Sequence, residues 1–127
     1  MAVRTVSPRE FSVEEVLEFV TTEKVYRDFE GYVVKMNSLR YQVFLKGRVC
    51  ASCGIEGSVF LLQQALDALP HRAHFNLYAR DKDGLLVLMT KDHIKPRSKG
   101  GSHALSNLQP MCSPCNVAKG NSEEGSD

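Results

Sequence analysis

The sequence predicts a single α+β domain. A chain of 127 residues, 43% hydrophobic and 24% charged, has the length and composition of one ordinary globular domain. Runs in which apolar and polar residues alternate predict strands, and apolar residues at helical spacing after Ser12 predict a helix. The core must be modest and contains no Trp, so a structural metal would help to stabilise it.

The first third of the chain predicts a helix and a β-hairpin after a loose arm at residues 1–10. Ser12 and Glu15 have the spacing of a capping box, which predicts a helix from about 13 to 21. Residues 32–36 and 40–45 alternate apolar and polar side chains around a short turn, so we expect two paired strands there. This extension covers residues 1–48.

The middle of the chain predicts a second hairpin. Residues 59–69 fit a helix or a strand, and Pro70 ends the element in either case. Residues 74–79 and 85–89 alternate on each side of an Asp-Lys-Asp-Gly turn, which is a strong hairpin signal. The second of these strands leads directly into Asp92 and His93.

The end of the chain predicts a loop, a short strand and a short helix. Residues 94–106 are rich in Pro, Gly and Ser, and residues 107–109 could form the strand. Ser113-Pro114 is a helix-start signature for a helix over about 114–119, with Gly120 as its stop. An acidic, disordered tail is expected at 122–127.

The net charge of the chain argues neither for nor against binding to nucleic acid. The formal net charge is +1, from 16 basic and 15 acidic residues, so any surface for nucleic acid must be local. Residues 91–99 carry four basic side chains against one acid, whereas His71 and His74 fit surface or turn positions. The chain has no apolar run of membrane-spanning length and no apolar signal core. We therefore expect a cytoplasmic protein with reduced thiols and no membrane partner.

The four cysteines form two C-x2-C pairs, Cys50 with Cys53 and Cys112 with Cys115. Gly54 after the first pair allows the backbone to fold back beneath an ion. Four thiolates around Zn²⁺ make a closed tetrahedral site, which is structural rather than catalytic. Free thiols, an iron–sulfur cluster or a redox pair are the alternatives.

Asp92-His93 is a weak signal by itself, because adjacent residues on a strand point to opposite faces. Its surroundings make it informative. The order is a strand, Asp92-His93-Ile94, Pro96, Ser98, Gly100-Gly101, Asn107-Leu108, Cys112, Cys115-Asn116 and Lys119-Gly120. This order resembles the HNH endonuclease family, in its zinc-bearing branch, over a predicted nuclease core at residues 49–121.

The resemblance implies a ββα-metal (His-Me finger) core and assigns four catalytic positions. His93 would be the general base, and Asp92 and Asn116 would hold a catalytic Mg²⁺ or Mn²⁺. Asn107 would brace the loop that orients His93. Asn116 stands where the family often has His, so the sequence is of an H-N-N type. An imidazole with a pKa of about 6.5 can accept a proton from water at neutral pH.

The implied function is hydrolysis of DNA phosphodiester bonds, by nicking or double-strand cleavage, leaving 5′-phosphate and 3′-hydroxyl ends. Backbone contacts are expected from the basic and polar side chains of the motif: Lys95, Arg97, Lys99, His103 and Lys119. A homodimer or a partner protein could serve to cut both strands. The alternatives are a non-catalytic nucleic-acid-binding zinc module of the same fold and a purely structural zinc domain.

Overall fold

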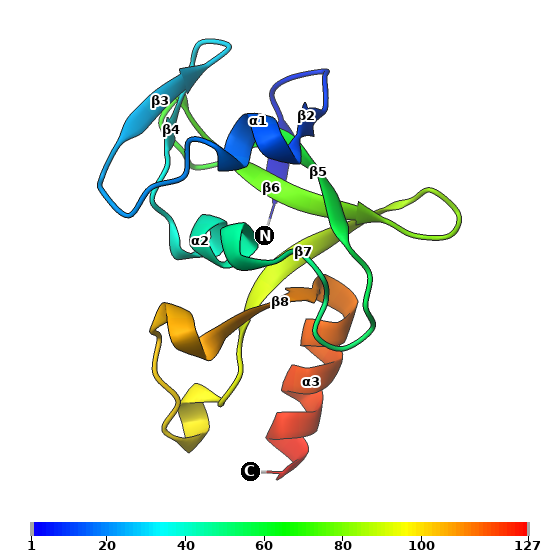
Figure 1. The fold of residues 1–127 in the computed structure, drawn as a ribbon. Helices are drawn as coiled ribbons and strands as arrows, with labels where there is room; N and C mark the ends of the chain where they lie inside the picture. The colour runs from blue at the N-terminus through cyan, green and yellow to red at the C-terminus, as the bar shows by residue number, and fades with distance from the viewer. Residues whose placement is uncertain (1, 127) are drawn as a thin grey trace.

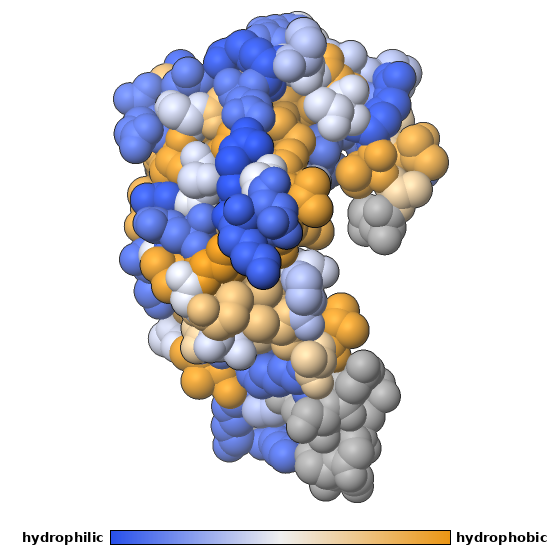
Figure 2. All heavy atoms as spheres, turned by 90° about the vertical axis from the view of Figure 1, so that its right-hand side faces the viewer, coloured by the Kyte–Doolittle hydropathy of each residue, from blue (hydrophilic) through white to orange (hydrophobic). Residues whose placement is uncertain are grey.

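The computed structural model describes residues 2–126, with side chains described for residues 2–120 (Figure 1). The side chains of the expected acidic tail at 122–127 therefore lie outside the described residues. Strands make up most of the upper part of the molecule, and a long C-terminal helix runs along its lower part. Seen from the side, the molecule bends around a hollow (Figure 2).

Eight strands form one sheet in the described part of the chain. Its main path is β1–β5–β6–β4–β3, while β2 pairs with β5, and β7 pairs with both β6 and β8. All these pairs are antiparallel except β4 with β6. The bounds are β1 Val3–Thr5, β2 Phe11–Ser12, β3 Tyr26–Phe29, β4 Tyr32–Lys35, β5 Gly57–Ala65, β6 Arg72–Arg80, β7 Leu86–His93 and β8 Leu108–Cys112.

The sheet forks between β6 and β7. The two strands pair from Arg80 opposite Leu86 to Tyr78 opposite Leu88. Beyond that point β7 pairs with β8, and β6 continues between β5 and β4. Helix α2, Leu39–Lys46, lies between the two arms of the fork (Figure 1). Its Tyr41 hydroxyl accepts a hydrogen bond of 2.8 Å from the Phe75 amide on the β6 arm.

The predicted strand at residues 40–45 is wrong, because this segment is helix α2. Ser38 caps the helix by accepting from the Tyr41 amide at 3.2 Å. Tyr41 and Phe44 are both about 1% exposed, whereas Leu45 is 55% exposed. Burial therefore follows the helical spacing of three residues and not the alternation that suggested a strand.

The N-terminal arm predicted at residues 1–10 is also wrong, because β1 pairs with β5, with Val3 opposite Ala65. The capping box is confirmed: Ser12 Oγ accepts from the Glu15 amide at 3.1 Å and starts helix α1, Val13–Leu17, which is shorter than expected. The ambiguous segment 59–69 is mainly strand β5. The hairpin around Gly84 is confirmed as β6–β7.

Helix α3, Ser113–Ser126, begins where expected but continues through Gly120. The loop before it contains two short 3-10 helices, η1 Arg97–Lys99 and η2 Leu105–Asn107. Among the described residues, no helix is both long enough and apolar enough to cross a membrane.

One hydrophobic core joins both halves of the chain. It runs from Phe11, Val16 and Tyr41 in the first half to Phe75 and Met111 in the second. The Phe75 ring makes edge contacts with Phe11 at 5.0 Å between ring centroids. The predicted extension at 1–48 thus packs directly on the strands that lead to the HNH-like motif.

Candidate active site and metal centre

The predicted reactive residues lie on the end of β7 and on the face of α3 that packs against it. Asp92 and His93 are the last two residues of β7, opposite Gln109 and Leu108 on β8. Because α3 starts directly after β8, it turns back across β7 and packs against it. Asn116 and Lys119 are three residues apart on α3, which places them on one face of the helix.

The Asp92 carboxylate is held by a cation and an amide. Its Oδ2 accepts from Lys119 Nζ at 2.6 Å and from Gln109 Nε2 at 3.1 Å. Lys119 Nζ also donates to the His93 carbonyl oxygen at 2.7 Å. The Asp92 side chain is 11% exposed. Lys119 therefore fastens α3 to the end of β7 and places a positive charge beside the carboxylate.

Asn116 contacts β7 one helical turn away from Lys119. Its Nδ2 donates to Thr90 Oγ1 at 2.8 Å and lies 3.5 Å from the Lys91 carbonyl oxygen. Thr90 and Asp92 are two residues apart on β7 and so face the same side of the strand. Asp92 and Asn116 thus share one seam, and each is held by a different partner.

His93 Nε2 lies 3.0 Å from His103 Nδ1, so one imidazole donates to the other. The ring centroids are 5.1 Å apart. Burial, followed by His103 and then by the charges of Lys91 and Arg97, lowers the pKa of His93, and Asp92 opposes this effect. The imidazole is therefore neutral at neutral pH, which is the form that can accept a proton.

Asn107 holds the loop between β7 and β8. Its Oδ1 accepts from the Lys95 amide at 2.9 Å, and its Nδ2 donates to the carbonyl oxygens of Lys95 at 3.1 Å and Ser102 at 2.6 Å. The backbone comes so close here that a Cβ on Gly101 would lie 1.8 Å from the Lys95 carbonyl oxygen. Only glycine fits at that position.

The four cysteines meet where the Cys50–Cys53 turn contacts β8 and α3. Their sulfur atoms all lie within 4.8 Å of one another, and Cys53 Sγ is 3.8 Å from Cys112 Sγ. Four sulfurs at about 2.3 Å from a central zinc would be about 3.8 Å apart. The turn is suited to this arrangement: Gly54 has φ of +83° and its amide donates to the Cys50 carbonyl at 3.0 Å. The cluster can hold a metal such as zinc.

The thiol pKa values show why this cluster suits a cation. Burial disfavours the Cys50 thiolate, but the amides of Cys53, Cys112 and Ser52 outweigh it and lower the pKa to about 6. Burial and the neighbouring thiols raise the pKa of Cys112 to about 12. One negative charge in the cluster therefore opposes a second, and a divalent cation would relieve that repulsion.

Residues 80–122 match the family model of HNH endonuclease. The chain carries an HNH segment. The expected family is thereby confirmed over the motif that suggested it. Searches of the curated proteins and of the solved structures found no match.

The side chains that were predicted to contact the DNA backbone lie in two places. Lys95, Arg97, Lys99 and His103 are exposed on the loop between β7 and β8. Lys119 instead lies within α3 against Asp92. His103, expected to contact phosphate, lies against His93.

Two side chains of the site were missed by sequence reasoning. Thr90 lies two residues before Asp92, and strand periodicity would place it on the same face. Gln109 directly follows Asn107-Leu108, and its register opposite Asp92 required the β7–β8 pairing. Both act on residues of the motif rather than belonging to it.

Proposed function

We propose that this protein is a metal-dependent endonuclease that hydrolyses DNA phosphodiester bonds. The observation that supports this most is the double contact of Lys119, which draws α3 onto the end of β7. This contact holds the face of α3 that carries Asn116 against the strand end that carries Asp92 and His93. HNH nucleases act on DNA, and the match of residues 80–122 makes DNA the expected substrate.

Asp92 and Asn116 are the proposed holders of a catalytic Mg²⁺ or Mn²⁺. The residues fit such an ion, because both offer oxygen, the donor that hard cations prefer. Among the described residues, none bonds Asp92 Oδ1, and Lys119 shows that a cation can sit at Oδ2. A bound divalent ion would supply charge neutralisation for the phosphate and the leaving oxygen.

His93 is the proposed general base. We assign the shared proton to Nε2, which donates to His103 Nδ1 and leaves Nδ1 of His93 able to accept a proton from water. His103 then fixes the tautomer of the base. Asn107 keeps the loop in the conformation that carries His103 beside His93. Loss of the base should lower the rate by about 10²–10⁴-fold.

The exposed basic side chains Lys95, Arg97 and Lys99 are proposed to contact the DNA backbone beside the site. Lys119 and His103 face the reacting groups and would approach the same phosphate. Cleavage would leave 5′-phosphate and 3′-hydroxyl ends. A single site cuts one strand at a time, so a second copy or a partner protein would serve a double-strand cut.

The four-cysteine cluster is proposed to bind a structural zinc that links the Cys50–Cys53 turn to the start of α3. Residues 49–121 would then form the ββα-metal core from β7, β8 and α3, and residues 1–48 its extension. Reduced thiols that bind zinc suit a cytoplasmic location.

A plasmid-nicking assay tests the proposal. Wild type should cut in Mg²⁺ or Mn²⁺ and not in EDTA, and His93→Ala should lose at least about 10²-fold of the rate. The matched control is His71→Ala, because His71 is exposed and lies outside the HNH segment. If His93→Ala cuts as fast as wild type, the mechanism is wrong.

The second candidate is a nucleic-acid-binding zinc module without turnover. The observation that favours it is the ammonium of Lys119 at Asp92 Oδ2, where a catalytic ion would have to compete. Binding of DNA without cutting in any divalent metal would support this candidate. Lys119→Met would remove the ammonium that competes with a metal ion at Asp92. If this candidate is right, the variant should still not cut DNA.

A further inference from the structure

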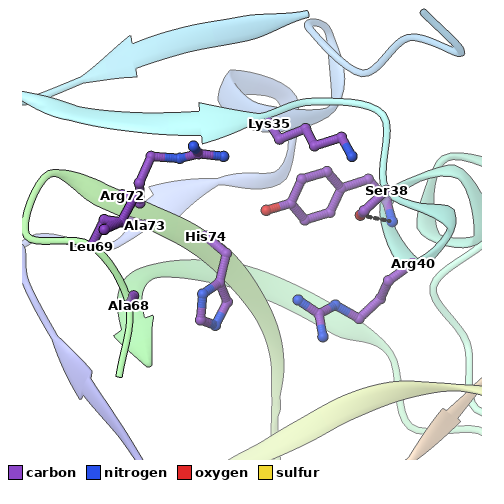
Figure 3. A pocket seen from close by; sticks show the side chains of 9 residues that line it. Lys35, Ser38, Arg40, Ala68, Leu69, Arg72, Ala73 and His74 are labelled. Carbon is purple, nitrogen blue, oxygen red and sulfur yellow. Dashed lines mark hydrogen bonds between the residues drawn. The ribbon is translucent and has the colours of Figure 1, made fainter. Parts of the chain in front are cut away.

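A cationic pocket lies outside the HNH segment, where α2 begins. It has a volume of about 380 Å³, and its lining includes Lys35, Ser38, Arg40, Arg72 and His74 (Figure 3). Lys35 ends β4, Arg40 is in the first turn of α2, and Arg72 begins β6. Three separate elements thus bring three permanent positive charges to one cavity. None of the sites described above uses them.

No carboxylate lines the pocket. The nearest acid along the chain is Asp67, which is exposed and precedes the lining residue Ala68. Arg72 stacks 4.8 Å above the Tyr26 ring, and Arg40 donates to the Phe75 carbonyl at 3.5 Å. Neither interaction neutralises charge. Within the described residues, no ion pair includes any of the three cations.

Arg40 also carries a buried donor without a partner. Its Nε is shielded from solvent and bonds to no described atom. A buried donor that makes no hydrogen bond has given up its bonds to water without replacement, which destabilises the fold. Three cations without a counter-ion and one unsatisfied donor are unfavourable for folding, and the cations that line the cavity are suited to an anion that accepts hydrogen bonds.

His74 contributes a neutral donor to the same cavity. Asn76 Nδ2 donates to Gln63 Oε1 at 2.6 Å, so the nitrogen end of that amide also faces His74 Nε2, at 3.2 Å. The imidazole therefore accepts at Nε2 and carries its hydrogen on Nδ1. In Figure 3 the ring lies between Arg40 and Arg72. Every titratable group that lines the cavity can thus present an N–H or O–H donor.

Helix α2 runs from the pocket toward the HNH loop. The first residues of α2 face the pocket, and Lys46 at its other end approaches the Leu105 carbonyl at 3.5 Å. A second cavity of about 290 Å³ shares Arg40 and His74 and extends to Leu88 on β7. An eight-residue helix is about 12 Å long, close to the width of the major groove between its bordering phosphates.

We propose that this pocket binds a backbone phosphate of the DNA substrate at a distance from the cleaved bond. The inference rests on the proposed function for the identity of the ligand. It gives residues 1–48 a role, because Lys35, Ser38 and Arg40 all come from them. The extension would then position the duplex across α2 while the HNH segment holds the cleaved strand.

The test is DNA binding without turnover. In the His93→Ala background and EDTA, the anisotropy of a labelled duplex of about 30 base pairs is followed as salt is raised. The test variant combines Lys35→Gln with Arg72→Gln, and a second variant carries Lys35→Gln alone. The charge control combines Lys82→Gln with Lys24→Gln, because both lysines are exposed and neither lines the pocket.

The double variant should bind about tenfold more weakly at 0.15 M salt than the control. Its slope of log affinity against log salt should be about 0.9 smaller than that of wild type, because the pocket neutralises one phosphate and each phosphate no longer neutralised lowers the slope by about 0.9. Equal affinity and slope for the double variant and its control would overturn the proposal. Unchanged melting temperature and zinc content show that the variants are folded.

Two further outcomes are decisive. If inorganic phosphate shifts the His74 resonances but the double variant binds DNA like its control, the pocket takes a small anion and the proposal fails. If wild type never cuts DNA but its binding depends on Lys35 and Arg72, the proposed nuclease function fails and this inference stands. If wild type cuts DNA but its binding does not depend on Lys35 and Arg72, the proposed nuclease function stands and this inference fails.

Discussion

Thr90 on β7 fixes the orientation of the Asn116 amide on α3. The Thr90 hydroxyl donates to the Met111 carbonyl at 2.7 Å, so its oxygen can only accept from Asn116 Nδ2, at 2.8 Å. The Lys91 carbonyl, at 3.5 Å, also requires the nitrogen end of the amide. Oδ1 is therefore turned away from β7, and none of the described residues bonds it. This orientation leaves Oδ1 available to a metal ion of the kind proposed above.

Thr90→Val should weaken divalent-metal binding about tenfold or more, the lower end of the effect usual for groups that orient a ligand. Valine keeps the branched shape but leaves the Asn116 amide free to rotate. Titration of Mn²⁺ followed by electron paramagnetic resonance measures the affinity without turnover. Thr90→Ser keeps the hydroxyl and should bind Mn²⁺ like wild type. Equal affinity for Thr90→Val would show that Asn116 is oriented by other means or is not a ligand.

Gly101→Ala should disrupt the loop between β7 and β8. Its Cβ would lie 1.8 Å from the Lys95 carbonyl oxygen, which belongs to rigid backbone held by Asn107. We expect loss of nicking by at least about 10²-fold, since misplacement by about 1 Å can have that effect. Gly100→Ala is the matched control. It faces open space apart from Lys95 Nζ at 3.9 Å, and its φ of +86° costs only about 1–2 kcal/mol. Equal activity of the two variants would contradict the steric argument.

Cys112→Ser should remove the zinc and unfold or strongly destabilise the protein. Cys112 is 3% exposed at the junction of β8 and α3, so a zinc ion there would join the Cys50–Cys53 turn to the helix that carries Asn116. Elemental analysis should find one zinc per chain in wild type, and circular dichroism should show a sharply lower melting temperature for the variant. Ser113→Ala, next in the sequence, should keep the zinc and lose only the stability of a helix cap, about 0.5–2 kcal/mol. A zinc-free wild type of unchanged stability would refute the assignment.

Tyr41→Phe should destabilise the fold by about 1–3 kcal/mol without affecting zinc content. The variant leaves the buried Phe75 amide without its acceptor, and an unsatisfied buried donor has a cost of this size. Denaturant unfolding measures the free-energy difference. Leu45→Ala on the same helix is the control, because Leu45 is 55% exposed and should change stability by about 0.5 kcal/mol or less. A neutral Tyr41→Phe would mean that water replaces the hydroxyl.

The sequence predicted best where the signal is local. The Ser12–Glu15 cap, the hairpin around Gly84 and the start of α3 each depend on a few adjacent residues, and the structure has them. The clustering of Cys50, Cys53, Cys112 and Cys115 follows from their spacing and from thiol chemistry. The order of motif residues from Asp92 to Gly120 was sufficient to indicate the family, which the match of residues 80–122 confirms.

Long-range packing decided the rest. Residues 40–45 alternate in hydrophobicity and yet form α2, because Ser38 caps a helix whose buried face fills the fork between β6 and β7. The arm at residues 1–10 contains β1 only because the edge of β5 is available to pair with it. The local hydrophobic pattern predicts neither the fork between β6 and β7 nor the edge of β5.

The sequence by itself determined which residue types carry the chemistry: an Asp-His pair, an Asn on the final helix and four thiols. The tertiary structure alone decided their partners. Lys119 lies on Asp92 and Thr90 on Asn116 because α3 turns back across β7. His103 lies on His93 because the loop between β7 and β8 folds back onto the end of β7. These contacts join residues that are 10 to 27 positions apart in the sequence. Residues so far apart come into contact only when the sheet, the loop and the helix pack together.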